Sequence, residues 1–181
     1  MLPLTNRDNT CCFSGYRPEK LPWGENEDNP GCEALKENLK NAAEKIYMSG
    51  IRHFITGMAR GSDTYFCEAM LDLHKKYADI TVEAAIPYVR QAARWREEEQ
   101  DRYVRLLELC DEVTYVSREY KRDCMYRRNR YMVDNSSVLL AVFDGQPGGT
   151  KYTLDRARRR GLEIITISPG IYKSEQGMVP T

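Results

Sequence analysis

The sequence predicts an α/β fold in which one three-layer domain holds a mostly parallel sheet of about six strands, with helices on both faces. Short apolar runs alternate with longer amphipathic stretches along the 181 residues, a pattern typical of strands joined by crossover helices. The run 137–143 is almost continuously apolar, as expected of a central strand buried on both faces. The length favours a single domain, and a hydrophobic content of 41% can supply its core.

The expected elements follow one another without a long linker. Strands are predicted at 10–14, 53–56, 81–86, 112–116, 137–143 and 163–167. Helices are predicted at 32–49, 62–77, 91–110, 123–135 and 150–160. In the third helix, Ala92, Trp95 and Tyr103 fall near one apolar stripe. The single domain, 1–181, therefore has a core of about 11–168 and a loosely attached tail at 169–181.

Composition narrows the choice of partners and location. Basic and acidic residues number 27 each, so the net charge gives no general attraction to nucleic acid or to an anionic membrane, and we do not expect nucleic acid as a partner. No run approaches membrane-spanning length, and the first ten residues lack the apolar core of a secretory signal. Six cysteines without a C-x-x-C pair predict reduced thiols and no metal site. A cytoplasmic protein is the expectation.

The most informative segment joins the predicted strand 53–56 to the predicted helix 62–77. Gly57 and Gly61 allow backbone conformations and close approaches that a side chain would prevent. The following helix offers unpaired N–H groups and the positive end of its dipole. The segment therefore predicts a phosphate cradle. A plain strand-to-helix turn, in which Asp63 only caps the helix, is the alternative.

Three turns are expected to meet at one edge of the sheet. The carboxyl ends of parallel strands share an edge, and ligands bind there where the strand order reverses. The turns 14–18, 57–63 and 144–150 all follow predicted strands. Thr150 can cap the last helix and present a hydroxyl group to a phosphate, although a simple helix cap is the alternative.

The predicted helix 123–135 carries an arginine-rich segment toward the same edge. Arginine suits bidentate phosphate contacts, and an asparagine can bind a base or a ribose edge. Met125, Met132 and Val133 are expected to face the core, which leaves some of the three arginines at 127, 128 and 130, together with Asn129, for the crevice or for solvent. A solvated basic face is the alternative. The residues predicted to bind the ligand are Gly15, Tyr16, Arg17, Gly57, Met58, Gly61, Ser62, Asp63, Arg128, Asn129, Gly148, Gly149 and Thr150.

Several motifs in one order resemble a known family. They are SGYRP (14–18), TGMARGSD (56–63), AIPY (85–88), RNRYMVD (128–134) and PGGT (147–150). Together they resemble the YpsA-like family of the SLOG superfamily, and the resemblance covers almost the whole chain. It implies a Rossmann-like domain with a pocket for a nucleotide or a nucleotide derivative, which such proteins are proposed to sense or process.

Two further resemblances open functional alternatives. The segment 57–63 is similar to a turn of the DNA-processing protein A family, which implies binding of single-stranded DNA, although the balanced charge argues against a basic groove. The segment 147–149 resembles the start of the motif of Lonely Guy phosphoribohydrolases. The chain departs from that motif at Lys151, where a glycine is expected, and at Asp155, where a glutamate is expected. An N-glycosidic hydrolase would need a carboxylate, from Asp63, Asp134 or Asp155, and a donor to the leaving base, from Arg128.

The first functional expectation is a nucleotide-binding protein that acts as a ligand sensor or regulatory module. AMP, ADP-ribose and NAD are the ligands to test. Hydrolysis of nucleoside monophosphates and binding of single-stranded DNA are the alternatives. A homodimer is also expected, because symmetric homo-oligomers are common.

Overall fold

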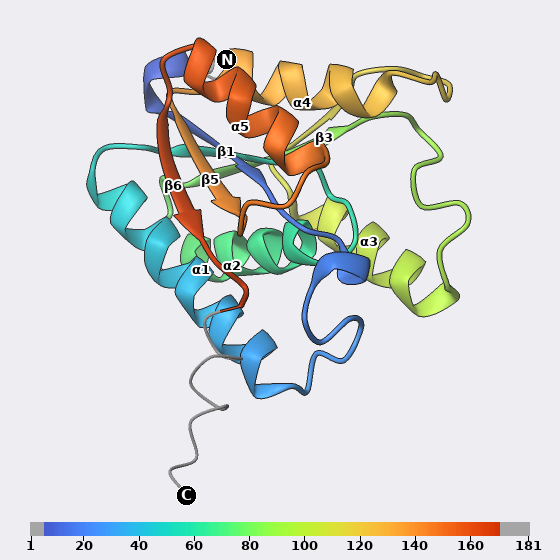
Figure 1. Ribbon diagram of the computed structural model, residues 1–181. Coiled ribbons are helices and arrows are strands. Elements are labelled where there is room, and N and C mark those ends of the chain that lie inside the picture. Colours follow the sequence, from blue (N-terminus) through green and yellow to red (C-terminus); the bar gives the residue numbers. More distant parts are fainter. Residues whose placement is uncertain (1–5, 171–181) are drawn as a thin grey trace, which may run out of the picture.

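The computed structural model describes residues 6–170 and contains one six-stranded parallel sheet (Figure 1). The strands are β1 (Thr10–Ser14), β2 (His53–Thr56), β3 (Thr81–Ile86), β4 (Glu112–Tyr115), β5 (Val138–Val142) and β6 (Glu163–Ile167). Their order across the sheet is β4-β3-β2-β1-β5-β6, and every neighbouring pair is parallel. The predicted α/β class and the interior position of the fifth strand are confirmed. The strand order reverses between β1 and β5, so the topological switch point lies there.

Helices cover both faces of the sheet. They are α1 (Pro30–Met48), α2 (Ser62–Lys76), α3 (Glu97–Leu109), α4 (Cys124–Asp134) and α5 (Gly149–Arg159). Figure 1 shows α1, α2 and α3 on one side of the sheet and α4 and α5 on the other. Two short 3-10 helices, η1 (Arg7–Asn9) and η2 (Pro18–Lys20), flank β1.

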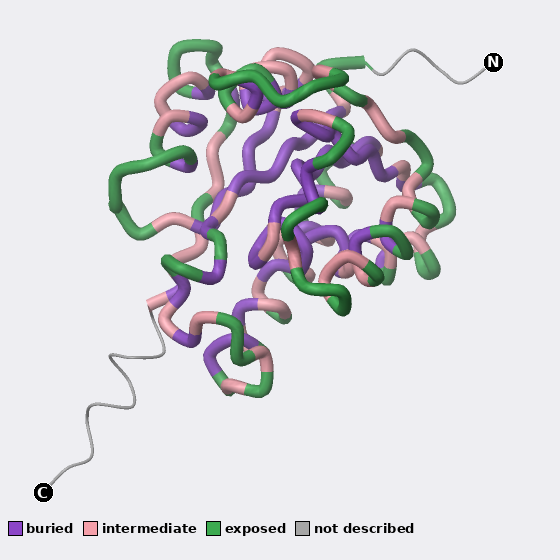
Figure 2. The backbone as a smooth tube through the Cα atoms, turned by 90° about the vertical axis from the view of Figure 1, so that its right-hand side faces the viewer, coloured by how far each residue is buried: buried purple, intermediate pink, exposed green. Residues whose placement is uncertain are grey.

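The two faces of β1 belong to different parts of the core. Phe13 packs with residues of α1 and α2, and its ring stacks on that of Phe66 with the centroids 4.5 Å apart. Cys12 points the other way and packs with residues of α4 and α5. Successive side chains of a strand alternate between faces, so β1 is buried along its whole length, as Figure 2 shows for the centre of the molecule. A sheet buried on both faces fixes the strands rigidly beneath the loops that leave their carboxyl ends.

The third helix starts later than predicted. It begins at Glu97, whereas the sequence analysis placed its start at residue 91. The backbone N–H of Arg96, the N-cap residue, donates to the Glu99 carboxylate at 3.2 Å, which satisfies one backbone donor at the true start of the helix. Gln91 and Trp95 lie in the turns before the helix, so the apolar pattern there reflects burial in a loop.

The remaining expectations about the chain are met in part. All six cysteines are free thiols. Within residues 6–170, no helix has the length and apolar character needed to cross a membrane. The predicted tail begins at residue 169, and its part beyond Gly170 lies outside the described residues.

Candidate functional site

A cavity of about 390 Å³ opens at the carboxyl edge of the sheet, beside the switch point between β1 and β5. We call it the Arg128 cavity. It is lined by residues of all three predicted turns and of α4, among them Gly15, Arg17, Asp63, Arg128, Asn129, Gly149 and Thr150. The topology therefore brings together segments that are more than a hundred residues apart in the chain.

Arg128 is a buried cation in this cavity, with only 5% of its surface exposed. Its Nη1 donates to the carbonyl oxygen of Gly57 at 2.5 Å, and its Nε donates to Oδ1 of Asn129 at 2.9 Å. Among the described residues, its Nη2 finds one hydrogen-bond acceptor, the sulfur of Met125 at 3.9 Å. No carboxylate among residues 6–170 forms an ion pair with this guanidinium. Burial lowers the pKa of Arg128, whereas the charge of Asp63 raises it, so the pocket holds a positive charge that is costly to desolvate.

Asp63 is a buried acid that lines the same cavity. It is 5% exposed, and its carboxylate accepts the backbone N–H of Ala59 at 3.1 Å. Burial raises the pKa of Asp63, and the charge of Arg128 together with the Ala59 hydrogen bond opposes that rise. Asp63 thus stabilises the turn before α2 and also lines the cavity. Gly61 is the N-cap residue of α2 and no side chain caps the helix, so the helix-cap interpretation of Asp63 is wrong.

The first two turns are held against each other by small residues. Gly61 has a φ angle of +84°, and a Cβ atom there would lie 2.9 Å from the carbonyl oxygen of Tyr16. The hydroxyl group of Ser62 donates to that carbonyl oxygen at 2.6 Å. Ser62 is fully buried, so its role is to join the turns. Met58 is also buried, with a left-handed φ of +54°, and does not line the cavity.

The third turn presents the start of α5 to the cavity. Gly148 is the N-cap residue, with φ of +138°, so the expectation that Thr150 caps the helix is wrong. Thr150 lies in the first helical turn and lines the cavity with Gly149. The first N–H groups of a helix have no partner within the helix and attract anions. Lys20 approaches the same turn and donates to the carbonyl oxygen of Pro147 at 2.5 Å.

Tyr16 fastens the first turn to the third. Its hydroxyl donates to Oδ1 of Asp144 at 2.6 Å and accepts the backbone N–H groups of Asp144 and Gln146 at 3.2 and 3.3 Å. Its side chain is almost fully buried. Tyr16 therefore acts as a positioning residue for the turn.

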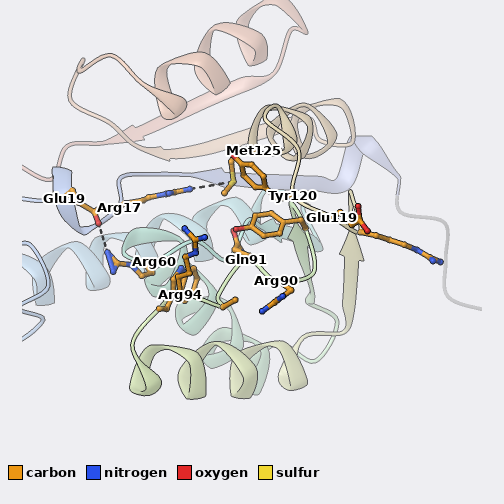
Figure 3. Close-up of a pocket in the computed structure, with 13 residues that line it drawn as sticks. Arg17, Glu19, Arg60, Arg90, Gln91, Arg94, Glu119, Tyr120 and Met125 are labelled. Atoms are coloured by element: carbon orange, nitrogen blue, oxygen red, sulfur yellow. Dashed lines mark hydrogen bonds and ion pairs between the residues drawn. The ribbon is translucent and has the colours of Figure 1, made fainter.

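A second, larger cavity of about 1030 Å³ lies on the β3 and β4 side of the first (Figure 3). We call it the arginine cavity, because Arg17, Arg60, Arg90, Arg94 and Arg118 line it. Tyr88, Trp95 and Tyr120 also line it. Arg17, Glu19 and Met125 line both cavities, and Figure 3 shows Arg17 pointing toward Met125, whose sulfur lies 3.8 Å from its Nη2. Met125 therefore borders the crevice, whereas the sequence analysis placed it in the core.

Most residues of this second cavity were not predicted from the sequence. Those at 88–95 and 118–120 come from separate loops after β3 and β4, and they form no compact motif. Their place in the sequence could have predicted the cavity, because both loops follow strands and therefore leave the carboxyl edge of the sheet. The local gathering of arginines also means that the balanced net charge does not argue against nucleic acid, and that expectation is not supported.

Two of the predicted acids lie outside both cavities. Asp134, at the end of α4, is ion-paired with Arg156 at 2.7 Å. Asp155, on the exposed side of α5, is ion-paired with Lys151 at 2.8 Å and with Arg158 at 3.1 Å. Neither lines a cavity described above. Of the acids considered for catalysis, the structure therefore places only Asp63 beside Arg128.

One further polar cluster lies on the neighbouring strands β2, β3 and β4. Ligand atoms of His53, Glu83 and Glu112 are within 4.8 Å of one another. Both oxygens of Glu83 already accept hydrogen bonds, from Tyr131 and Thr114 on one side and from the His53 ring on the other. These contacts satisfy Glu83 and His53 in a buried network, and Glu112 lies exposed beside it.

Comparison with known proteins places the chain in a family. The YpsA family model, described as the YspA SLOG family, matches residues 11–167. The chain belongs to the YpsA SLOG family. It is 26% identical over 151 residues to a UPF0398 protein of Bacillus thuringiensis, with 82% of each chain covered.

Solved structures show that this YpsA-family chain shares its fold with DNA processing protein A. The protein from Streptococcus pneumoniae matches with a TM-score of 0.56 and 12% identity, over 87% of this chain and 49% of that one. The chain thus spans about half of that relative. The protein from Helicobacter pylori, described by its single-stranded DNA binding mode, matches with a TM-score of 0.56 and 13% identity, over 93% and 72% of the two chains. At this identity the likeness concerns the fold.

Proposed function

We propose that this YpsA-family protein binds a nucleotide or nucleotide derivative in the Arg128 cavity and acts as a ligand sensor or regulatory module. The observation that carries the proposal is the buried guanidinium of Arg128. It faces a cavity, lacks an ion-paired carboxylate within the described chain and leaves Nη2 with only a sulfur contact. A buried charge is normally paired, and a phosphate group would supply the partner.

The surroundings of Arg128 support a nucleotide rather than a bare anion. The start of α5 lies across the cavity, where Gly149 and Thr150 offer N–H groups and a hydroxyl group to the same phosphate. Asn129 and Asp63 supply amide and carboxylate groups that suit ribose hydroxyls or a base edge. The cavity volume falls in the range of about 300–1,000 Å³ that is usual for small-molecule sites. Six free cysteines fit a reducing compartment, and we propose a cytoplasmic location.

Thermal unfolding with AMP, ADP-ribose and NAD tests this proposal. A ligand present at a hundred times its dissociation constant adds about 2.7 kcal/mol to stability, which gives a clear shift of the midpoint. Arg128→Gln and Thr150→Val should each reduce the shift, because one removes the cation and the other a cavity hydroxyl. Arg127→Gln is the matched control, because Arg127 is an exposed neighbour that pairs with Asp123. Absence of any shift, or an equal loss in the control, would overturn the proposal.

Hydrolysis of an N-glycosidic bond is a second candidate function, favoured by Asp63. A buried carboxyl group with a raised pKa beside a cation can hold a proton or stabilise an oxocarbenium-like centre. Release of free base from nucleoside monophosphates would show the activity. Asp63→Asn should abolish it while Asp155→Asn, on the exposed side of α5, leaves it unchanged. Equal turnover in wild type and Asp63→Asn would remove this role.

Single-stranded DNA is a third candidate, favoured by the arginines and tyrosines of the second cavity. Phosphate contacts and base stacking are the two interactions that sequence-independent strand binding uses. The Helicobacter pylori neighbour, whose description names that ligand, shares the fold. A mobility shift with an oligonucleotide at 50 and 200 mM salt should show affinity that falls steeply with salt. An affinity that does not change with salt concentration would contradict this candidate.

A further inference from the structure

The arginine cavity contains positive charge that the described chain leaves unpaired. Arg60 is paired with Glu19 at 2.6 Å, as Figure 3 shows. Arg90, Arg94 and Arg118 line the same cavity and form no ion pair with any acid among residues 6–170. Two acids, Glu19 and Glu119, also line the cavity, but Glu19 is the partner of Arg60 and Glu119 forms no ion pair among the described residues. Three unpaired arginines against one unpaired acid favour an anionic occupant.

Aromatic side chains provide apolar surface beside these charges. The rings of Tyr88 and Tyr120 meet edge to face with the centroids 5.4 Å apart, and Tyr120 is 65% exposed although it is large and partly apolar. Trp95 lines the cavity near Arg94. Stacking of a nucleobase on an exposed aromatic ring is worth about 1–3 kcal/mol. Arginines and exposed rings in one cavity suit a base attached to a phosphate.

Gln91 adds an unpaired polar atom to the cavity wall. Its Nε2 donates to the carbonyl oxygens of Gly57 and Met58 at 3.4 and 3.3 Å. Both neighbours are acceptors, so the amide must turn its NH₂ group toward them, which assigns the other atom as oxygen. That Oε1 is buried and has no donor among the described residues, although Gln91 lines the cavity.

The two cavities are neighbours on one edge of the sheet. Arg17 and Met125 line both cavities and contact each other between them. A ligand that extends beyond this contact would occupy both cavities. The guanidinium of Arg17 is exposed and can serve a phosphate between the two sites. The backbone carbonyl of Gly57 also touches Arg128 from one side and Gln91 from the other.

We propose that the arginine cavity is a second subsite, which binds the base and phosphate of a second nucleoside unit. The ligand is then two nucleosides joined through phosphate, with one phosphate at Arg128 and the distal unit among Arg94, Arg118 and the tyrosines. This inference rests on the proposed function, because the first phosphate must lie at Arg128. A free pyrophosphate-linked dinucleotide and a stretch of single-stranded DNA both have this chemistry.

Isothermal titration of the full chain with four ligands tests the second subsite and distinguishes its sources. The ligands are AMP, NAD, the phosphodiester pApA and a ten-residue deoxyadenylate. The test variant is Arg94→Gln with Arg118→Gln. The control is Arg158→Gln with Arg159→Gln, which removes two positive charges from the far end of α5. Tyr120→Ala tests stacking separately at an exposed position.

The wild-type protein should bind at least one two-nucleoside ligand tenfold or more tightly than AMP. The double variant and Tyr120→Ala should each remove most of that advantage and leave the affinity for AMP within twofold of wild type. The matched control should leave the affinity for every ligand within twofold of wild type. A gain for NAD alone assigns the site to a free dinucleotide, whereas a gain for pApA that grows with the longer strand assigns it to DNA. If AMP binds and no longer ligand binds better, the second subsite is wrong and the proposed function stands. If no ligand binds, both are wrong.

Discussion

The guanidinium of Arg128 in α4 donates a hydrogen bond of 2.5 Å to the carbonyl oxygen of Gly57, the first residue after β2. This contact places the buried cation of the cavity directly above the glycine turn. A Cβ atom on Gly57 would overlap the same guanidinium, so glycine is required there by the close approach of a side chain. The turn and the arginine form one unit.

Gly57→Ala should therefore displace Arg128 and weaken nucleotide binding at least tenfold. Overpacking at a buried contact of this kind costs about 1–3 kcal/mol, so the variant should unfold at lower urea concentration but still fold. Gly170→Ala is the control, because a Cβ atom there meets only Ser168 at 3.8 Å. Titration calorimetry and urea unfolding measure both effects. Wild-type affinity in Gly57→Ala would show that the position of Arg128 does not matter for binding.

Tyr16→Phe should loosen the turn between β5 and α5. The change removes the hydrogen bond to Asp144 and the acceptor of two backbone N–H groups, of which that of Gln146 keeps a bond to Asp144, a loss of about 1 kcal/mol in stability. Because this turn leads to Gly149 and Thr150, ligand affinity should fall a few fold. Tyr47→Phe is the matched control, since its hydroxyl bonds Asp79 at an exposed place on the protein surface. An equal response of the two variants would contradict a positioning role for Tyr16.

The features that could be predicted from the sequence are those that local interactions determine. The strands were placed to within a residue or two, because short apolar runs between polar turns report burial directly. The start of α3 was misplaced because Ala92 and Trp95 continue its apolar spacing although they lie in turns. Parallel topology alone brought Gly15 and Gly149 to one cavity.

The rest of the site depended on contacts that spacing cannot reveal. The ion pair of Asp134 with Arg156 joins α4 to α5 and could not be read from the sequence. The pairs of Asp155 with Lys151 and Arg158, in contrast, follow the i,i+4 and i,i+3 spacing of one helix. Arg94 and Arg118 meet across two loops with no shared motif. Asp63 and Arg128 were found because they lie in motifs beside the turns.

Glu83→Gln should reduce the loss of unfolding free energy that occurs as the pH falls. Burial alone would raise the pKa of Glu83, but hydrogen bonds from His53, Tyr131 and Thr114 outweigh it and hold the pKa below its ordinary value of 4.5. A depressed folded-state pKa contributes stability above the unfolded value, and this contribution is lost as the pH falls through the folded pKa. Urea unfolding between pH 7 and 3 should therefore show a smaller acid loss in Glu83→Gln than in wild type.

The same variant should also be less stable at pH 7, by about 1–3 kcal/mol, because a buried charge-assisted network is weakened. Glu98→Gln, on the exposed side of α3, is the control and should follow the wild-type profile. Parallel profiles for wild type and Glu83→Gln would mean that the network does not hold the carboxylate charged.

Cys110 should be the fast-reacting thiol of the folded protein. Its Sγ lies 4.0 Å from that of Cys67, and the hydrogen bond from Cys67 lowers the pKa of Cys110. The other five thiols are buried, and burial raises the pKa of Cys12 to about 12. Since the thiolate is the reactive form, Ellman's reagent at pH 8 should modify one thiol per chain quickly. Cys110→Ala should abolish that phase, whereas Cys32→Ala should keep it, and all six thiols should react in guanidinium chloride. A fast phase that survives in Cys110→Ala would show that a buried thiol is reached by local opening of the fold instead.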